Sequence, residues 1–271
     1  MTRKPTLERL RPALGTFVRI NASADSRAQL ERALAAAFTE IEAVEARLSL
    51  FRPDSDLSRI NQRRDAVSVH PQTLRILRLA CRMAEQSQHR FNPTVGGALV
   101  ARGRLPDQGG DLLPVGCAAD ILIHGTTVSL RRPMYLTLDG IAKGWAVDRA
   151  IATLRAHGVR EATVNAGGDW RCIGRSEAIT RPHPDGTLWL GRLSQGACAT
   201  SAAGLDPKRF PALLMADDQP VSHGVWTVIA PTAWQADALT KVAAAGADAA
   251  DWVARCGGQL LAAEGILPHA A

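Results

Sequence analysis

The stretch "YLTLDGIAKGWAVDRAIATL", residues 135–154, changes its pattern halfway along. Its first four residues are aromatic, branched or large apolar types that are typical of a strand. A turn follows at Asp139-Gly140, and the residues after it predict a helix whose first turn carries Lys143. The stretch therefore predicts a strand that enters a helix through a glycine-containing corner, which is typical of mixed α/β folds.

The chemistry of this corner suits a phosphate group. A helix that begins after a glycine turn presents unpaired backbone N–H groups and a partial positive charge. Glycine lets a ligand approach the backbone closely, and Lys143 adds a full positive charge. The spacing matches neither GxxxxGK[ST] nor GxGxxG. A helix cap with a solvated lysine explains the same residues equally well, so both interpretations stay open at this point.

Composition indicates an ordinary globular protein. The chain has 271 residues, of which 46% are hydrophobic and 21% are charged, and this allows one domain with a sizeable core. The formal net charge of +6 suits an anionic partner, but we favour a solvated basic surface. The sequence has no basic tract interleaved with aromatic residues, so we expect no nucleic-acid binding. We expect no membrane insertion and a cytoplasmic protein, since no apolar run approaches a membrane span and the first residues show neither a signal peptide nor a lipobox.

The cysteines predict reduced core thiols. They are odd in number, scattered along the chain and never in CxxC spacing, so they indicate neither a disulfide framework nor a zinc site. The five are Cys81, Cys117, Cys172, Cys198 and Cys256.

Patterns along the rest of the chain predict one domain, residues 1–271, whose first 12 or so residues are flexible. Ser26 and Gln29 have the spacing of a capping box before a long helix with one apolar stripe. Pro71 stands where a second helix could begin, and "FNPTVGGALVARG" after it resembles a loop. Residues 232–257 predict one helix or two. Further strands are expected within 14–23, 119–140, 161–174, 187–194, 196–203 and 225–231.

Five segments in a fixed order resemble the ApbE family, the flavin transferases that attach FMN to other proteins. They are "ALGTFVRI", "FNPTVGGAL", "LDGIAKGWAVD", "VNAGGDWRCIG" and "VIAPTAWQADALTK". The family patterns are approximately M-G-T, F-[DN]-P-T-V-G, D-L-G-G-I-A-K-G-Y-A-V-D, N-x-G-G-D and A-D-A-L-[AS]-T. The resemblance runs from about Leu14 to Asp237.

The resemblance implies a single α/β (α+β) domain with a mixed sheet and flanking helices, in the ApbE-like, T-fold-like architecture. It also implies FAD as substrate or ligand, a magnesium ion on the FAD pyrophosphate, and an acceptor flavoprotein whose threonine or serine hydroxyl receives FMN while AMP leaves. In such a site Gly140 would offer a backbone carbonyl to the metal and Asp237 a carboxylate. The residues expected near the flavin nucleotide are Leu14, Gly15, Thr16, Phe91, Asn92, Thr94, Thr137 and Lys143.

Structural alternatives accompany these assignments. Asp237 could be a helix-capping carboxylate, and Phe91 a core residue. Thr94 could satisfy a loop backbone. The segment from Asn165 to Asp169 could be only a tight turn.

Two departures from the family pattern affect the chemistry. The family usually has H-[IV]-[IL]-D-P-x-T-G before the last strand, and its histidine is a candidate base. Here Pro211 falls at the histidine and Leu214 at the aspartate, so His223 is the remaining candidate if its loop folds back to the site. Lys241 replaces the threonine that would ligate the metal, and a protonated lysine repels a cation. We therefore expect weak magnesium binding and an ion pair between Lys241 and Asp237.

Other departures are milder. Leu14 stands for the usual methionine, and Thr137 stands for the aspartate of D-L-G-G, with Asp139 two places later. The family's S-G-[DG]-Y after "ATS" becomes "ATSAAGL". Three hypotheses follow: an FAD:protein FMN transferase with an altered base, a catalytically impaired flavin-binding carrier or sensor, and an interaction protein that has lost the ligand.

Overall fold

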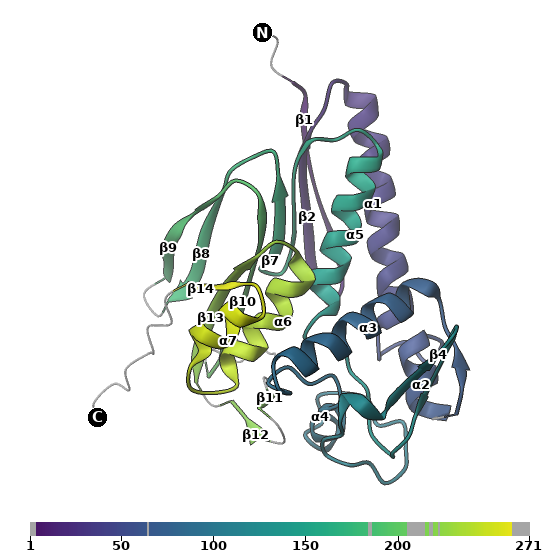
Figure 1. Ribbon diagram of the computed structural model, residues 1–271. Helices are drawn as coiled ribbons and strands as arrows, with labels where there is room; N and C mark the ends of the chain where they lie inside the picture. The colour runs from purple at the N-terminus through teal and green to yellow at the C-terminus, as the bar shows by residue number, and fades with distance from the viewer. Residues whose placement is uncertain are drawn as a thin grey trace. The chain divides into compact units, whose positions relative to one another are not determined.

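The computed structural model describes residues 4–63, 65–183, 186–204, 215–216, 219–221 and 223–261. In chain order its elements are β1 (Thr6–Ala13), β2 (Thr16–Ser23), α1 (Arg27–Leu48), α2 (Asp56–Arg63), β3 (Val67–Ser68), α3 (Pro71–Gln86), α4 (Gly96–Ala101), a 3-10 turn (Ala118–Asp120), β4 (Ile121–His124), β5 (Thr127–Leu130), α5 (Ala142–Ala156), β6 (Glu161–Ala166), β7 (Asp169–Ile173), β8 (Glu177–His183), β9 (Gly186–Leu193), β10 (Gly196–Ala203), β11 (Met215–Ala216), β12 (Gln219–Pro220), β13 (Gly224–Ala230), α6 (Ala233–Ala244), α7 (Ala249–Arg255) and β14 (Gln259–Leu261). Figure 1 shows their course.

The chain forms two compact units that are each built from several segments. Unit 1 comprises Met1–Ala46, Ile141–Ala199 and Ile229–Asp237, and unit 2 comprises Arg47–Gly140, Thr200–Val228 and Ala238–Ala271. Hydrogen bonds order one seven-stranded sheet as β1-β2-β6-β7-β10-β13-β14. The mixed α and β composition and the sheet with flanking helices confirm the predicted fold class.

Unit 1 is built on the antiparallel strands β1, β2, β6 and β7, with α1 and α5 on one face (Figure 1). Residues on that face alternate with exposed or half-buried ones, as the period of a strand requires. Val18, Ile20 and Ala22 of β2 and Ala162 and Val164 of β6 are all fully buried there. The stripe of α1 predicted from its spacing is buried too, with Leu30, Leu34, Phe38, Ile41 and Val44 at most 2% exposed.

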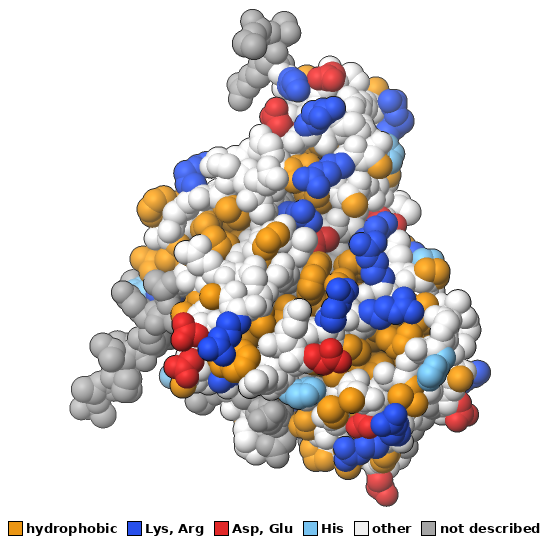
Figure 2. All heavy atoms as spheres, in the orientation of Figure 1, with side chains coloured by type: hydrophobic (Ala, Val, Ile, Leu, Met, Phe, Trp, Pro, Cys, Tyr) orange, Lys and Arg blue, Asp and Glu red, His pale blue; other side chains and the backbone are white. Residues whose placement is uncertain are grey.

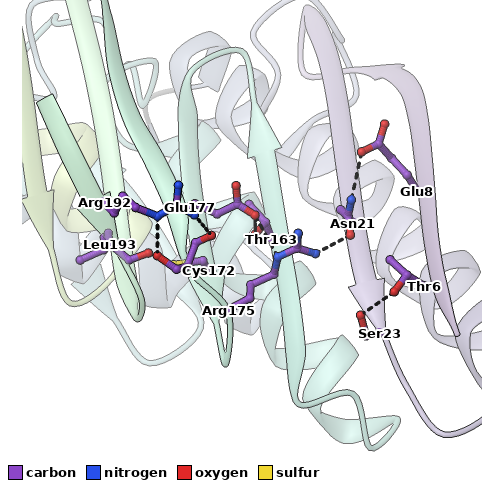
Figure 3. A network of polar contacts seen from close by, with 11 residues as sticks. Thr6, Glu8, Asn21, Ser23, Thr163, Cys172, Arg175, Glu177, Arg192 and Leu193 are labelled. Atoms are coloured by element: carbon purple, nitrogen blue, oxygen red, sulfur yellow. Dashed lines mark hydrogen bonds and ion pairs between the residues drawn. The ribbon is translucent and has the colours of Figure 1, made fainter. Parts of the chain in front are cut away.

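The opposite face of this sheet carries a polar network in place of a helix layer (Figure 3). The Thr163 hydroxyl donates to Glu177, whose other contact is an ion pair with Arg175 at 2.9 Å. Arg175 also donates to Asn21, and the Asn21 amide donates to Glu8. Because Arg175 and Glu177 lie at the start of the β8–β9 hairpin, the network joins this hairpin to the sheet through side chains.

Unit 2 contains a three-stranded sheet in the order β3-β5-β4, with α2, α3 and α4. Helix α3 begins at Pro71, as the sequence predicts, and His70 caps it by accepting the N–H of Gln72.

The last helical region forms two helices, α6 and α7. The predicted cap of α1 is present as well, because Ser26 accepts the N–H of Gln29.

Residues 134–138 belong to no strand, so this part of the predicted strand-to-helix corner was wrong. Its backbone bonds go to a neighbouring loop: Thr137 donates to Pro93 at 2.8 Å, and Gly96 donates to the Tyr135 carbonyl at 3.2 Å. Asn61 completes the pairing by bonding both the N–H and the carbonyl of Leu136. The Tyr135 carbonyl, the Thr137 N–H and both backbone groups of Leu136 are thus paired without a ladder.

Two further segments differ from the expected pattern. Residues 96–101, expected to be loop, form the short helix α4. The N-terminal stretch expected to be flexible contributes β1, which pairs with β2 from Thr6↔Ser23 to Ala13↔Thr16. Leu7 of β1 is buried on the helix-covered face, so this strand is tied down by packing as well as by hydrogen bonds.

The spread of basic side chains over the surface and the burial of the cysteines can both be compared with the sequence predictions. On the face shown in Figure 2, Lys and Arg side chains are spread over the surface among other types. All five cysteines are unpaired, and burial raises the pKa of Cys81 to about 11 and that of Cys198 to about 12. Cys172, Cys198 and Cys256 are buried as predicted, whereas Cys81 and Cys117 are half-buried. No helix in the described part of the chain is long and apolar enough to cross a membrane.

Candidate functional site

Two tight turns of unit 1 bring two of the motif segments together. Leu14 and Gly15 form the β1–β2 turn with φ of 57° and 69°, and Gly167 and Gly168 form the β6–β7 turn with φ of 64° and 106°. A Cβ on Gly167 would lie 2.8 Å from the Thr16 hydroxyl oxygen, so the two turns pack against each other. The chain thus needs glycine at position 167 for both conformation and space.

Lys143 joins this group through an ion pair. Its Nζ lies 3.2 Å from Asp169, whose side chain is 5% exposed while that of Lys143 is 33% exposed. Asp169 directly follows the Gly167-Gly168 turn, and Asn165 accepts the Gly168 N–H across it. The segment therefore forms a tight turn that holds a carboxylate against the lysine, and its contact with a ligand stays a prediction. Lys143 lies in the first turn of α5, as predicted.

Helices α5 and α6 cap each other's first turns. Asp148 of α5 accepts the N–H groups of Ala233 and Trp234 at 3.0 and 2.9 Å. In return, Asp237 of α6 accepts the Gly144 N–H of α5 at 3.1 Å. Asp237 is fully buried. A carboxylate therefore compensates the partial positive charge at each helix start. The structural alternative expected Asp237 to cap the last helix, but the N–H that it accepts belongs to α5, and its role toward a metal stays a prediction.

Arg171 of β7 supplies the charge that balances Asp148. The guanidinium lies 2.5 Å from the Asp148 carboxylate, and both side chains are at least four-fifths buried. Burial raises the pKa of Asp148, while Arg171 and the two α6 N–H groups oppose that rise. We did not single out Asp148 or Arg171 from the sequence. The sequence did contain a signal for Asp148, since a carboxylate five residues after Lys143 falls on the apolar face of the predicted helix.

Gly144 is required by packing. A Cβ at this position would lie 2.2 Å from the carbonyl oxygen of Ala233 and 2.7 Å from the Cα of Trp234. Both are backbone atoms, which cannot move aside as a flexible side chain would. The second glycine of Gly-Ile-Ala-Lys-Gly thus allows the starts of α5 and α6 to meet, and this packing is sufficient to require it.

Unit 2 holds the other predicted ligand residues in a tightly bonded loop. Asn92 accepts both the N–H and the hydroxyl of Thr94, at 3.0 and 2.6 Å. Thr94 is fully buried, and Phe91 is 4% exposed. Thr137 donates its N–H to Pro93 and accepts the Asp139 N–H on its hydroxyl. These are the contacts expected if the residues stabilise local structure, and their contact with a flavin nucleotide stays a proposal.

Lys241 lies against Gly140 in the same unit. A Cβ placed on Gly140 would be 3.3 Å from Lys241 Cε and 3.2 Å from Phe91 Cε2. The aliphatic stem of the lysine therefore runs along the Gly140 backbone, which is the expected source of a metal-binding carbonyl. The predicted ion pair between Lys241 and Asp237 stays a prediction.

The residues expected to hold magnesium do not fit that ion. Magnesium prefers oxygen ligands in octahedral geometry, and Lys241 places a cationic side chain where a hydroxyl was needed. The neighbouring hydroxyl does not replace it, because Thr240 is fully buried and bonds Ser201 at 2.7 Å. At an effective dielectric near 20, an ammonium and a divalent ion about 4 Å apart repel by about 8 kcal/mol. The donor set thus differs from the one that the resemblance implies.

The structure says little about the base for the acceptor hydroxyl. His223 is exposed and directly precedes β13 in unit 2. Pro211 and Leu214, which stand at the family's histidine and aspartate positions, lie outside the described residues.

Comparisons with known proteins support the resemblance. The sequence model of the ApbE family matches residues 14–262. Curated FAD:protein FMN transferases are similar over shorter stretches: that of Vibrio cholerae is 30% identical over 162 residues, or 55% of this chain and 46% of the relative. That of Treponema pallidum is 29% identical over 180 residues, or 59% of this chain and 50% of the relative. The chain thus spans about half the length of these two curated relatives.

Solved structures extend the similarity over nearly the whole fold. The ApbE protein of Thermotoga maritima is 25% identical with a TM-score of 0.79, covering 96% of this chain and 95% of that one. The flavin transferase ApbE of Vibrio cholerae matches at 23% identity and a TM-score of 0.75, over 96% of this chain and 97% of that one, which shows the shared fold. With the family match spanning residues 14–262 and the motif turns assembled in unit 1, this chain belongs to the ApbE family.

Proposed function

We propose that this chain is an FAD:protein FMN transferase, which moves FMN from FAD to a threonine or serine hydroxyl of an acceptor protein. The observation that carries the proposal is the family match over residues 14–262. The names of the curated relatives support the same reaction. The gathering of Leu14–Thr16, Lys143 and Asn165–Asp169 in unit 1 supports a common role for these motif segments.

The reaction is a phosphoryl-type transfer. The acceptor hydroxyl oxygen bonds to the phosphorus of the FMN half, the pyrophosphate P–O bond breaks, and AMP leaves with the bonding electrons. The hydroxyl proton passes to a general base and from there to solvent. A protein accelerates such a step mainly by positioning and by stabilising charge. We assign Lys143, held by Asp169, to the phosphates. We assign Leu14, Gly15, Thr16, Phe91, Asn92, Thr94 and Thr137 to binding of the flavin nucleotide.

No step is assigned to magnesium, because the donor set at Gly140, Asp237 and Lys241 does not suit it. His223 is the proposed base for the acceptor hydroxyl.

The acceptor flavoprotein is not identified by the sequence or the fold, and the cytoplasmic location stays a prediction. A flavin-binding carrier or sensor is the second candidate, supported by the absence of the family's histidine at position 211.

The test measures both the released AMP and the protein that carries covalent flavin. Purified chain is incubated with FAD and a protein extract of the source cell, AMP is measured by chromatography, and proteins on a denaturing gel are examined for covalent flavin fluorescence. We expect AMP release and at least one fluorescent band. FAD binding without either product would favour the carrier or sensor.

The same assay with Lys143→Ala should show weaker FAD binding, because one phosphate-facing charge is lost. Lys4→Ala is the matched control, since Lys4 forms an exposed ion pair with Asp25 in unit 1. Equal FAD affinity of the Lys143→Ala variant and the wild type would contradict the assignment of Lys143.

A further inference from the structure

Lys241 brings a fixed positive charge to the carbonyl-bearing corner at Gly140. The stem passes so near that a Cβ on Gly140 would lie 3.4 Å from Lys241 Cγ and 3.3 Å from Cε. The ammonium is one bond beyond Cε. Lysine carries three donors and no acceptor, and it binds phosphate as a point charge.

The packing around the stem restricts where it can lie. Phe91, which is 4% exposed, approaches Gly140 from the same unit, with Cε2 3.2 Å from the position of the added Cβ. Lys241 itself is partly buried. The side chain therefore occupies a lined position, in contrast to a lysine that extends freely from a helix.

The hydroxyl next to Lys241 faces elsewhere. Successive residues of an α-helix point about 100° apart, and the fully buried Thr240 is bonded to Ser201 at 2.7 Å. Helix α6 therefore offers the Gly140 corner an ammonium and no hydroxyl oxygen. A divalent cation at this corner would meet repulsion, whereas a phosphate oxygen would meet a charge-assisted donor.

We propose that the Lys241 ammonium binds the phosphates of the flavin nucleotide in place of a divalent cation, so that this chain binds FAD without magnesium. The inference rests on the proposed function, since it takes FAD as the ligand. It concerns the electrostatics of binding, and a binding measurement can test it apart from the transfer reaction.

The experiment measures FAD affinity of the full chain by quenching of flavin fluorescence, once with EDTA and once with millimolar magnesium. We expect the wild type to bind FAD in EDTA, with magnesium changing the dissociation constant by less than about twofold. Lys241→Met keeps most of the stem but removes the charge, and it should weaken FAD binding in EDTA by about tenfold, the scale of one charge-assisted hydrogen bond. Riboflavin, which has no phosphate, is the ligand control, and its affinity should be unchanged in Lys241→Met.

A second variant tests whether a magnesium ion can take the place of the lysine ammonium. Lys241→Thr supplies the missing hydroxyl, so its FAD affinity should be low in EDTA and recover with magnesium. Lys241→Gln serves if Lys241→Met fails to fold, as judged by circular dichroism.

Each result decides the matter. The inference is overturned if the wild type binds FAD only with magnesium, or if the Lys241→Met or Lys241→Gln variant binds FAD in EDTA as tightly as the wild type. An equal loss of riboflavin and FAD affinity would show a packing role for Lys241 and also overturn it. Wild type that binds FAD under neither condition would contradict the proposed function itself, whereas binding that requires magnesium would contradict only the inference.

Discussion

Two glycines only four positions apart face different surroundings. Gly144 is buried where the first turns of α5 and α6 meet, and an added Cβ would strike backbone atoms of Ala233 and Trp234. Gly140 is partly exposed, and an added Cβ would meet the side chains of Phe91 and Lys241 at 3.2 to 3.4 Å. The sequence presents both as glycines of one corner, but only the first is fixed by a backbone contact.

This difference predicts unequal costs of substitution. Gly144→Ala should destabilise the protein by about 3 kcal/mol, the upper part of the usual range for overpacking, although alanine is intrinsically the better helix former. Gly140→Ala should cost less than about 1 kcal/mol, because its neighbours are side-chain atoms that can shift. Urea unfolding of the two variants provides the comparison. Equal losses in the two variants would show that the contact with Ala233 is not a close one.

At the scale of elements, the reciprocal caps make Asp148 central to unit 1. Its carboxylate serves two N–H groups of α6 and the guanidinium of Arg171, so one side chain links α5, α6 and β7. Removing it would leave the largely buried guanidinium, one buried N–H and one half-buried N–H without this acceptor. Such losses are among the few that cost several kcal/mol.

We therefore predict that Asp148→Ala lowers the free energy of unfolding by about 3–5 kcal/mol. Arg149→Ala is the matched control on the same helix, since it breaks a more exposed pair with Glu40 and should cost about 1 kcal/mol or less. Arg171→Met should partly rescue Asp148→Ala, because it removes the unpaired charge. Urea unfolding curves of the four proteins measure these differences. An Asp148→Ala cost no larger than that of Arg149→Ala would show that the caps contribute little.

The elements also show which parts of the fold follow from sequence patterns. The α1 stripe and the start of α3 at Pro71 depend on local periodicity and capping, and both were predicted correctly. The segment 134–138 has a strand-like composition, but its partners are a loop at Pro93–Gly96 and the Asn61 side chain. A strand requires a partner strand, and composition alone does not reveal that partner.

The candidate site shows the same boundary between local and long-range signals. The turn at Gly167-Gly168 and the helical position of Lys143 could be predicted from nearby residues. The Lys143–Asp169 pair and the caps by Asp148 and Asp237 join residues far apart in the chain. Only the family resemblance brought these segments into one site, and it assigned Asp237 to a metal without indicating its bond to Gly144.

At the scale of the whole molecule, the two units share regular elements. The division falls within α1, β10, β13 and α6, so each of these elements has residues in both units. Neither unit is a continuous stretch of chain that could be separated at a linker. Local unfolding of one unit would therefore break helices and strands that the other also uses.

We predict from this arrangement that the protein unfolds in one cooperative transition, as the single domain expected from the sequence would. Trp145 and Trp170 report on unit 1, and Trp252 reports on unit 2. Urea unfolding followed by tryptophan fluorescence and by far-ultraviolet circular dichroism should give coincident curves with one midpoint. A Trp252→Phe variant removes a reporter of unit 2, and its fluorescence curve should keep the midpoint seen by circular dichroism for that variant. Two separated transitions, or a fluorescence midpoint that departs from the dichroism midpoint of the same protein, would show that the units unfold independently despite their shared elements.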